Sequence, residues 1–166
     1  MTVTVEPMDF EDGGLIAKPI GSSHEYFRVR KGYHWIFAGL EKELQHLGYR
    51  IGYESGYIGK SESDDAVTMS IEIFVGEESE GDIVEASFDV TVVETDPGKA
   101  RLSYGPMTGP GAVPGIHYGE RDRSHAVSIE PDNALVEKVA GEIHRLAKIM
   151  IPAHKAAGWG RPIEDD

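Results

Sequence analysis

Two stretches of alternating apolar and polar side chains decide the fold: AVTMSIEIFV, residues 66–75, and IVEASFDVTVV, residues 83–93. A period of two puts the apolar members of each stretch on one face of a β-strand. The polar stretch GEESEGD, residues 76–82, separates them and is typical of a turn. We therefore predict that the two stretches form a long antiparallel hairpin, with Ile71 and Val90 in the core.

Shorter stretches on both sides extend this hairpin into a meander. YRIGY (49–53) precedes it, and RLSY (101–104) follows it after TDPGK (95–99), whose proline and glycine suit a turn. HAVSIE (125–130) is a candidate for one further strand. Because each strand has one apolar and one polar face, we expect helices to pack on one side of the sheet only.

A helix is predicted before the strands. Ser22 and Glu25 have the spacing of a capping box, which would start a helix at Ser22. Gly48 suits its end. Gly32 and Gly39 each weaken a helix by about 1 kcal/mol relative to alanine, so the segment is either one helix or two helices separated near Gly32. Its apolar stripe at three-and-four spacing consists of Tyr26, Val29, Tyr33, Ile36, Phe37, Leu40, Leu44 and Leu47.

A second helix is predicted near the C-terminus. Pro131 followed by Asp132 or Asn133 provides a helix start. We expect the helix to end before Pro152, because proline lacks the amide that would continue it. The apolar stripe consists of Leu135, Val136, Val139, Ile143, Leu146, Ala147 and Met150.

These elements predict one α+β domain over residues 1–166: a two-layer sandwich with an antiparallel meander of about four to five strands, packed by an N-terminal and a C-terminal helix. Three segments lie outside this frame. Residues 1–21 are expected to be an extended arm, residues 105–125 a long Gly/Pro-rich loop, and residues 153–166 a C-terminal tail.

Composition narrows the function. The chain has 16 basic and 29 acidic residues, a formal charge of −13, and no cysteine. A charge of this sign repels nucleic-acid phosphates, so we expect no direct nucleic-acid binding. The lack of cysteine excludes disulfides and thiolate chemistry. The acidity itself has three interpretations: simple solubility or salt adaptation, attraction to a basic partner, or mimicry of a phosphate backbone.

The sequence has no basic N-terminal region followed by an apolar run and no apolar run of membrane-spanning length. We therefore expect a soluble protein that does not insert into membranes. A cytoplasmic or virion location is the corresponding expectation.

Candidate catalytic and metal-binding residues are sparse. The seven histidines include no pair at helical metal-ligand spacing, and GYESG, residues 52–56, places its serine one position late for a nucleophile elbow. His117 and His125, with Glu120 or Asp122, are the best local set for acid–base chemistry or a metal. The simpler interpretation is a set of exposed loop residues. We assign no catalytic, cofactor-binding or metal-binding residue.

Two further patterns are weak matches to binding sites. The glycines of GPMTGPGAVPG, residues 105–115, lack the Lys-Ser/Thr pair of a phosphate loop, and its prolines remove amides. An aromatic group could line a small-molecule cavity, although aromatic residues at such spacings are more often core. This group consists of Trp35, Phe37, Tyr49, Tyr53 and Tyr57.

The arm and the long loop favour assembly, because such segments are useful when neighbouring subunits receive them. We predict that the loop docks against another copy of the chain or another protein subunit. Its interface residues are Met107, Val113, Ile116 and Tyr118, which are apolar or aromatic, and Arg121 and Arg123, which can pair with acidic surfaces.

Element order, and not any motif, also resembles known classes of protein. With its two arms the chain is similar to the small α+β connector and tail-terminator subunits of virus tails, which would imply a non-enzymatic structural role. A sheet around a long C-terminal helix is also similar to helix-grip ligand-binding proteins. A small-molecule-binding or enzymatic domain and an acidic inhibitor that mimics nucleic acid therefore remain alternatives to an assembly or adaptor subunit.

Overall fold

The computed structural model describes residues 4–8, 14–15, 26–30, 32–60, 66–107 and 123–162, and side chains for most of these. Two helices and nine strands follow one another along this part of the chain. They are β1 (Thr4–Met8), β2 (Gly14–Leu15), β3 (Tyr26–Arg30), α1 (His34–His46), β4 (Arg50–Lys60), β5 (Val67–Ser79), β6 (Asp82–Asp96), β7 (Lys99–Met107), β8 (Arg123–Ser128), α2 (Asn133–Ala156) and β9 (Arg161–Pro162).

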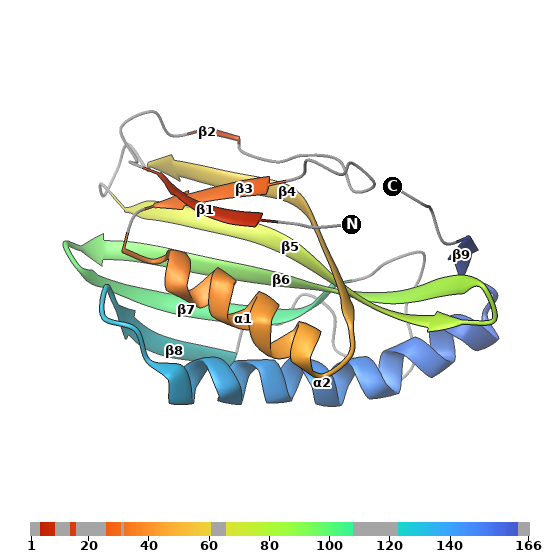
Figure 1. Cartoon of the computed structure of the whole chain (residues 1–166). Coiled ribbons are helices and arrows are strands. Elements are labelled where there is room, and N and C mark those ends of the chain that lie inside the picture. Colours follow the sequence, from red (N-terminus) through yellow and green to blue (C-terminus); the bar gives the residue numbers. More distant parts are fainter. Residues whose placement is uncertain are drawn as a thin grey trace.

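The main sheet has the order β2-β4-β5-β6-β7-β8, with β9 paired to β6, and its pairings are antiparallel. Helices α1 and α2 lie together against one face of this sheet (Figure 1). The strands β1 and β3 form a separate parallel pair beside α1. The predicted two-layer α+β sandwich, with a meander packed by an N-terminal and a C-terminal helix, is therefore confirmed.

The hydrophobic core fills the space between the helices and the sheet. Helix α1 contributes Ile36, Phe37, Leu40 and Leu44, all fully buried or nearly so. The strands contribute their alternate residues, as the period of two predicted. The two helices meet closely at Gly39, where an added Cβ would lie 3.0 Å from Val136 Cγ1.

The β5–β6 hairpin at the centre of the sheet confirms the strongest prediction. Its pairing runs without interruption from Val67 opposite Glu94 to Ser79 opposite Asp82. Only Glu80 and Gly81 form the turn, with φ of 53° and 87°. Positive φ at both positions is the geometry that matches the right-handed twist of the flanking strands. The predicted seven-residue turn is thus mostly strand.

The predicted N-terminal helix is wrong in its first half. Tyr26 and Val29, assigned to the helical stripe, lie in strand β3, and α1 begins only at His34. A helix cannot pass through Gly32, whose φ is +103°. The suggestion of two helices is also wrong, because the segment before Gly32 forms strand β3, although the break near Gly32 is real. The predicted capping pair at 22 and 25 lies outside the described residues.

Several boundaries at the arm and loop also differ from the sequence-based expectation. Within residues 1–21, β1 pairs with β3 and β2 with β4, so the described parts of the arm are strands that pair within the chain. Strands β7 and β8 include both ends of the predicted loop 105–125. Residues 108–122 lie outside the described part.

Helix α2 begins as predicted and ends later than predicted. Asp132 caps it by accepting a hydrogen bond of 3.1 Å from the Leu135 amide. The helix continues through Pro152 to Ala156, and residues 161–162 then pair with β6 as β9, so part of the predicted tail is ordered secondary structure. A proline removes one helical hydrogen bond without ending the helix where packing of both neighbouring turns compensates; here Met150, Ile151 and His154 are buried. Neither of the two helices in the described residues is long and apolar enough to span a membrane.

Candidate functional site

The predicted interface residues are only partly within the described structure. Met107 is the last residue of β7 and is half-buried, and Arg123 is the first residue of β8. Val113, Ile116, Tyr118 and Arg121 lie outside the described residues.

Arg123 turns toward α2 and pairs within the chain. Its Nε lies 3.2 Å from Oε1 of Glu142, which also binds Nη2 of Arg145 at 2.6 Å. The hydrogen bond from Arg145, and then that from Arg123, lower the pKa of Glu142 below its usual value. This network ties the edge of the sheet to the long helix, and the role of Arg123 between subunits stays a prediction.

The histidines are dispersed over the fold. His125 stacks on Tyr104 with ring centroids 6.0 Å apart. Burial, followed by the positive charges of Lys138 and Arg101, lowers the pKa of His125, which favours its neutral form. His144 bonds the Tyr49 hydroxyl at 2.8 Å, and buried His154 bonds the Glu85 carbonyl through Nδ1 at 2.8 Å.

These contacts do not assemble a recognisable catalytic or metal centre. No group of three potential metal ligands occurs among the residues that the structure describes. His117, with its neighbours Glu120 and Asp122, lies outside them. The described residues therefore do not test the candidate set around His117 and His125, to which we assign no catalytic or metal-binding role.

The aromatic group proposed for a cavity divides between core and surface. Phe37 and Tyr49 are buried in the main core, as the simpler interpretation predicted. Trp35 is only partly buried and lines a surface hollow described below. The side chains of Tyr53 and Tyr57 are outside the described part.

The two buried carboxylates in the described part of the chain, Glu94 and Asp89, have structural partners. Glu94 accepts hydrogen bonds from the Tyr33 hydroxyl at 2.5 Å and from the Gly98 amide at 3.0 Å, next to the β6–β7 turn. Asp89 accepts from the hydroxyls of Ser70 and Thr91, each at 2.9 Å. Satisfied buried carboxylates of this kind stabilise the arrangement of strands and are no evidence of a site.

A cationic hollow occupies the helix-free face of the sheet beside the β6–β7 turn. It has a volume of about 520 Å³ and is lined by Val93, Thr95, Lys99, Ala100, Arg101, Ser103 and Ser124. Lys99 and Arg101 stand two apart on β7, so both side chains face the same way. Both are exposed, and neither forms an ion pair with any residue in the described segments.

An acidic tip lies at the other end of β6. We use this name for Glu77, Glu78, Glu80 and Asp82, around the β5–β6 turn. Glu77 binds Lys148 at 2.8 Å and Glu78 binds Arg50 at 3.1 Å. Glu80 and Asp82 are exposed and form no ion pair with the described part of the chain. Figure 1 shows this turn and the β6–β7 turn at opposite ends of the molecule.

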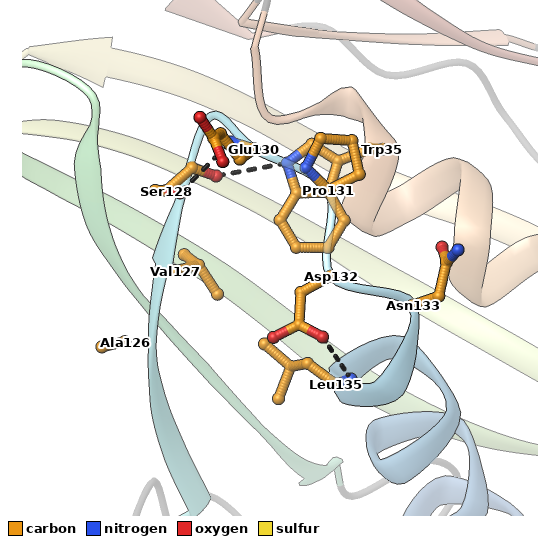
Figure 2. Close-up of a pocket in the computed structure, with 9 residues that line it drawn as sticks. All are labelled: Trp35, Ala126, Val127, Ser128, Glu130, Pro131, Asp132, Asn133 and Leu135. Atoms are coloured by element: carbon orange, nitrogen blue, oxygen red, sulfur yellow. Dashed lines mark hydrogen bonds between the residues drawn. The ribbon is translucent and has the colours of Figure 1, made fainter.

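A second hollow, here called the tryptophan hollow, lies where β8 leads into α2. Its volume is about 540 Å³, and its lining consists of Trp35, Ala126, Val127, Ser128, Glu130, Pro131, Asp132, Asn133 and Leu135 (Figure 2). The Trp35 indole donates a hydrogen bond of 3.2 Å to the Ser128 carbonyl, which fixes the ring across one end of the hollow.

The sequence did not lead us to predict the cationic hollow, the tryptophan hollow or the acidic tip. A signal for the cationic hollow was present, because Lys99 and Arg101 alternate on the polar side of a predicted strand. The acids of residues 77–82 were interpreted only as a turn. The tryptophan hollow had no such signal, because it brings Trp35 together with residues about a hundred positions later.

Comparisons with known proteins identify no relative. No protein-family model, no curated protein and no solved structure matches this chain.

Proposed function

We propose that the chain is a non-enzymatic assembly subunit whose copies associate head to tail. The observation that carries this proposal is the arrangement of charges beyond the two ends of β6. Lys99 and Arg101 lie on β7 next to its last residues, Glu80 and Asp82 lie at its start, and none of the four has an ion-pair partner among the described residues. In a chain with 29 acidic and 16 basic residues, two neighbouring cations without a carboxylate partner in the described segments are unexpected. A neighbouring copy would supply that partner through Glu80 and Asp82.

A contact between two different surfaces of the same chain has a definite consequence for assembly. It is heterologous, so it generates a closed ring if the rotation between copies closes and an open filament if it does not. Strand β6 has 15 residues, so the two surfaces lie about 50 Å apart along it. Rings of connector or tail-terminator type in a virus tail are one assembly that such a subunit would build.

The charges would set the orientation of the contact more than its strength. An exposed ion pair contributes about 0 to 1 kcal/mol, and two copies that each carry −13 repel at low salt. Further affinity must come from apolar surface. We assign it to Met107 at the end of β7 and to Val113, Ile116 and Tyr118, which follow it in the sequence, with Arg121 and Arg123 pairing to acids of the partner.

Charge reversal tests the proposal. One variant carries Lys99→Glu and Arg101→Glu, and a second carries Glu80→Lys and Asp82→Lys. In light scattering we expect the mass of the unchanged protein to increase with concentration, and we expect each variant alone to lose this increase. In a chain with all four substitutions, two basic residues become acidic and two acidic residues become basic, so the net charge stays at −13. This chain should regain assembly.

A matched control separates this contact from a general effect of charge. Glu130→Lys with Glu137→Lys changes the net charge as much as the tip variant does, at exposed positions outside both surfaces. This control should assemble at least as well as the unchanged protein. The head-to-tail contact would be refuted if the Lys99→Glu/Arg101→Glu variant and the Glu80→Lys/Asp82→Lys variant both still assembled. It would also be refuted if the unchanged protein stayed monomeric at high concentration with and without salt.

A further inference from the structure

The charged residues that line the tryptophan hollow in the described structure are acidic. Among the residues that the structure describes, its charged lining residues are Glu130 and Asp132, both exposed acids, and no described lysine, arginine or histidine lines it. In Figure 2 the Asp132 carboxylate lies between Val127 of β8 and Leu135 of α2. One carboxylate oxygen caps the helix through the Leu135 amide, which leaves the second oxygen for another donor.

The same hollow also offers apolar surface. Val127 is buried, Leu135 and Trp35 are partly buried, and Pro131 is exposed. A group that fits both features has an apolar stem and a positively charged end. Arginine and lysine side chains have this form, because their methylene stems pack on apolar surface while the charged end reaches an acid.

The hollow adjoins an edge of the sheet. Three of its lining residues, Ala126, Val127 and Ser128, belong to β8, which pairs only with β7 among the described strands. On the other side of β8, alternate backbone amides and carbonyls have no strand partner there. An extended segment can therefore add to β8 as a strand and place one side chain in the hollow.

We infer that the tryptophan hollow receives an arginine or lysine side chain from an extended, basic segment of a different protein. The charge of −13 favours such a partner over a second copy, whose field is repulsive. This inference is independent of the head-to-tail contact, because the hollow shares none of its described lining residues with the acidic tip or the cationic hollow.

The test uses a capped pentapeptide, Thr-Val-Arg-Val-Thr, and the same peptide with citrulline, the neutral analogue of arginine. Trp35 fluorescence reports binding in a Trp159→Phe background, where it is the remaining tryptophan. We expect a saturable change in the millimolar range with the arginine peptide. The citrulline peptide should bind about two- to fivefold more weakly, as expected for loss of an exposed ion pair.

Two variants separate charge from folding. Asp132→Asn keeps the helix cap, since asparagine caps as well as aspartate, and Glu130→Gln keeps the shape of the side chain. Each should weaken the arginine peptide by a similar factor and leave the citrulline peptide unchanged. Glu137→Gln, an exposed acid of α2 outside the lining, is the control and should have no effect.

Three outcomes would overturn the inference: equal binding of both peptides, no saturable response, or insensitivity to both acid substitutions. A Trp35 signal that changes with the concentration of the protein alone would also overturn it. That result would show that a second copy occupies the hollow. The first three outcomes do not bear on the charge-reversal test of assembly.

Discussion

Ile71 of β5 lies directly opposite Val90 of β6, and the two side chains are 2% and 0% exposed. The pair sits at the middle of the central hairpin, on the face that the helices cover. The stability of the domain should therefore depend strongly on these two positions.

We predict that Ile71→Asp prevents folding, because a buried carboxylate without a partner costs several kcal/mol of the about 5–15 kcal/mol that stabilise a domain. Circular dichroism and thermal melting measure the effect. Ile149→Asp introduces the same side chain at a residue that is 46% exposed, and it should lower the free energy of unfolding by less than about 1 kcal/mol. If both variants lowered the free energy of unfolding by similar amounts, the predicted burial of Ile71 in the core would be wrong.

The turn between β3 and α1 gives a second prediction. Gly32 has a φ of +103°, and an added Cβ would lie 2.9 Å from Cγ2 of Ile129. Gly32→Ala should therefore lower the free energy of unfolding by about 1–3 kcal/mol. Gly141→Ala, in open space within α2, should instead raise it by about 0.5–1 kcal/mol. Urea denaturation of both variants measures the contrast, and a stable Gly32→Ala protein would contradict the strained conformation.

The cap of α2 gives a third prediction. Asp132→Ala removes the acceptor of the Leu135 amide and should lower the free energy of unfolding by about 1 kcal/mol. Asp132→Asn should be nearly neutral, because its side-chain oxygen can accept the same hydrogen bond. Urea denaturation again provides the measurement. Equal losses in the two variants would mean that the charge of Asp132, and not its capping, stabilises the helix.

A fourth prediction concerns acid stability. The pKa of Glu142 is lowered by Arg145 and Arg123, so in the acid range the unfolded chain binds more protons at this position than the folded chain does. The contribution of Glu142 is thus present above its unfolded pKa, about 4.3, and is lost as the pH falls through the lower folded value. Glu142→Gln should melt at a lower temperature than the unchanged protein near neutral pH. The difference should shrink below pH about 4; a difference independent of pH would refute this linkage.

The sequence predicted those parts of the fold that depend on local periodicity. Ile71 and Val90 were placed correctly because alternation over ten residues leaves one register that buries the apolar face. Asp132 was correctly proposed for a helix start because capping needs only a few adjacent residues. Such features are encoded within a single element.

The errors arose where a distant contact overrides the local pattern. Tyr26 and Val29 fit a helical stripe, yet they lie in a strand that pairs with β1, a segment about twenty residues earlier. Pro152 suggested a helix end, whereas packing of the buried residues around it keeps the helix intact. The tryptophan hollow could not be predicted for the same reason, since it requires α1 and β8 to be adjacent.

The last prediction concerns the segment between β7 and β8, which belongs to the predicted long loop of residues 105–125. Met107 pairs with Ser87, and Arg123 pairs with Tyr104, so a deletion must leave both strands intact. Because Met107 lies three residues beyond Tyr104, about 10 Å of chain must be recovered before β8 begins. Replacing residues 109–121 with a Gly-Ser linker of about six residues spans that distance.

We expect the shortened protein to fold with nearly unchanged thermal stability and to lose assembly, because the proposed docking residues Val113, Ile116 and Tyr118 are removed while the core residues that the structure describes are all kept. Light scattering and thermal melting measure the two properties together. As a control, a full-length protein with Val113, Ile116 and Tyr118 changed to serine should lose assembly in the same way without shortening the chain. Assembly that persists in both proteins would show that the loop is not an interface arm. A shortened protein that unfolds would show that residues 109–121 stabilise their own domain.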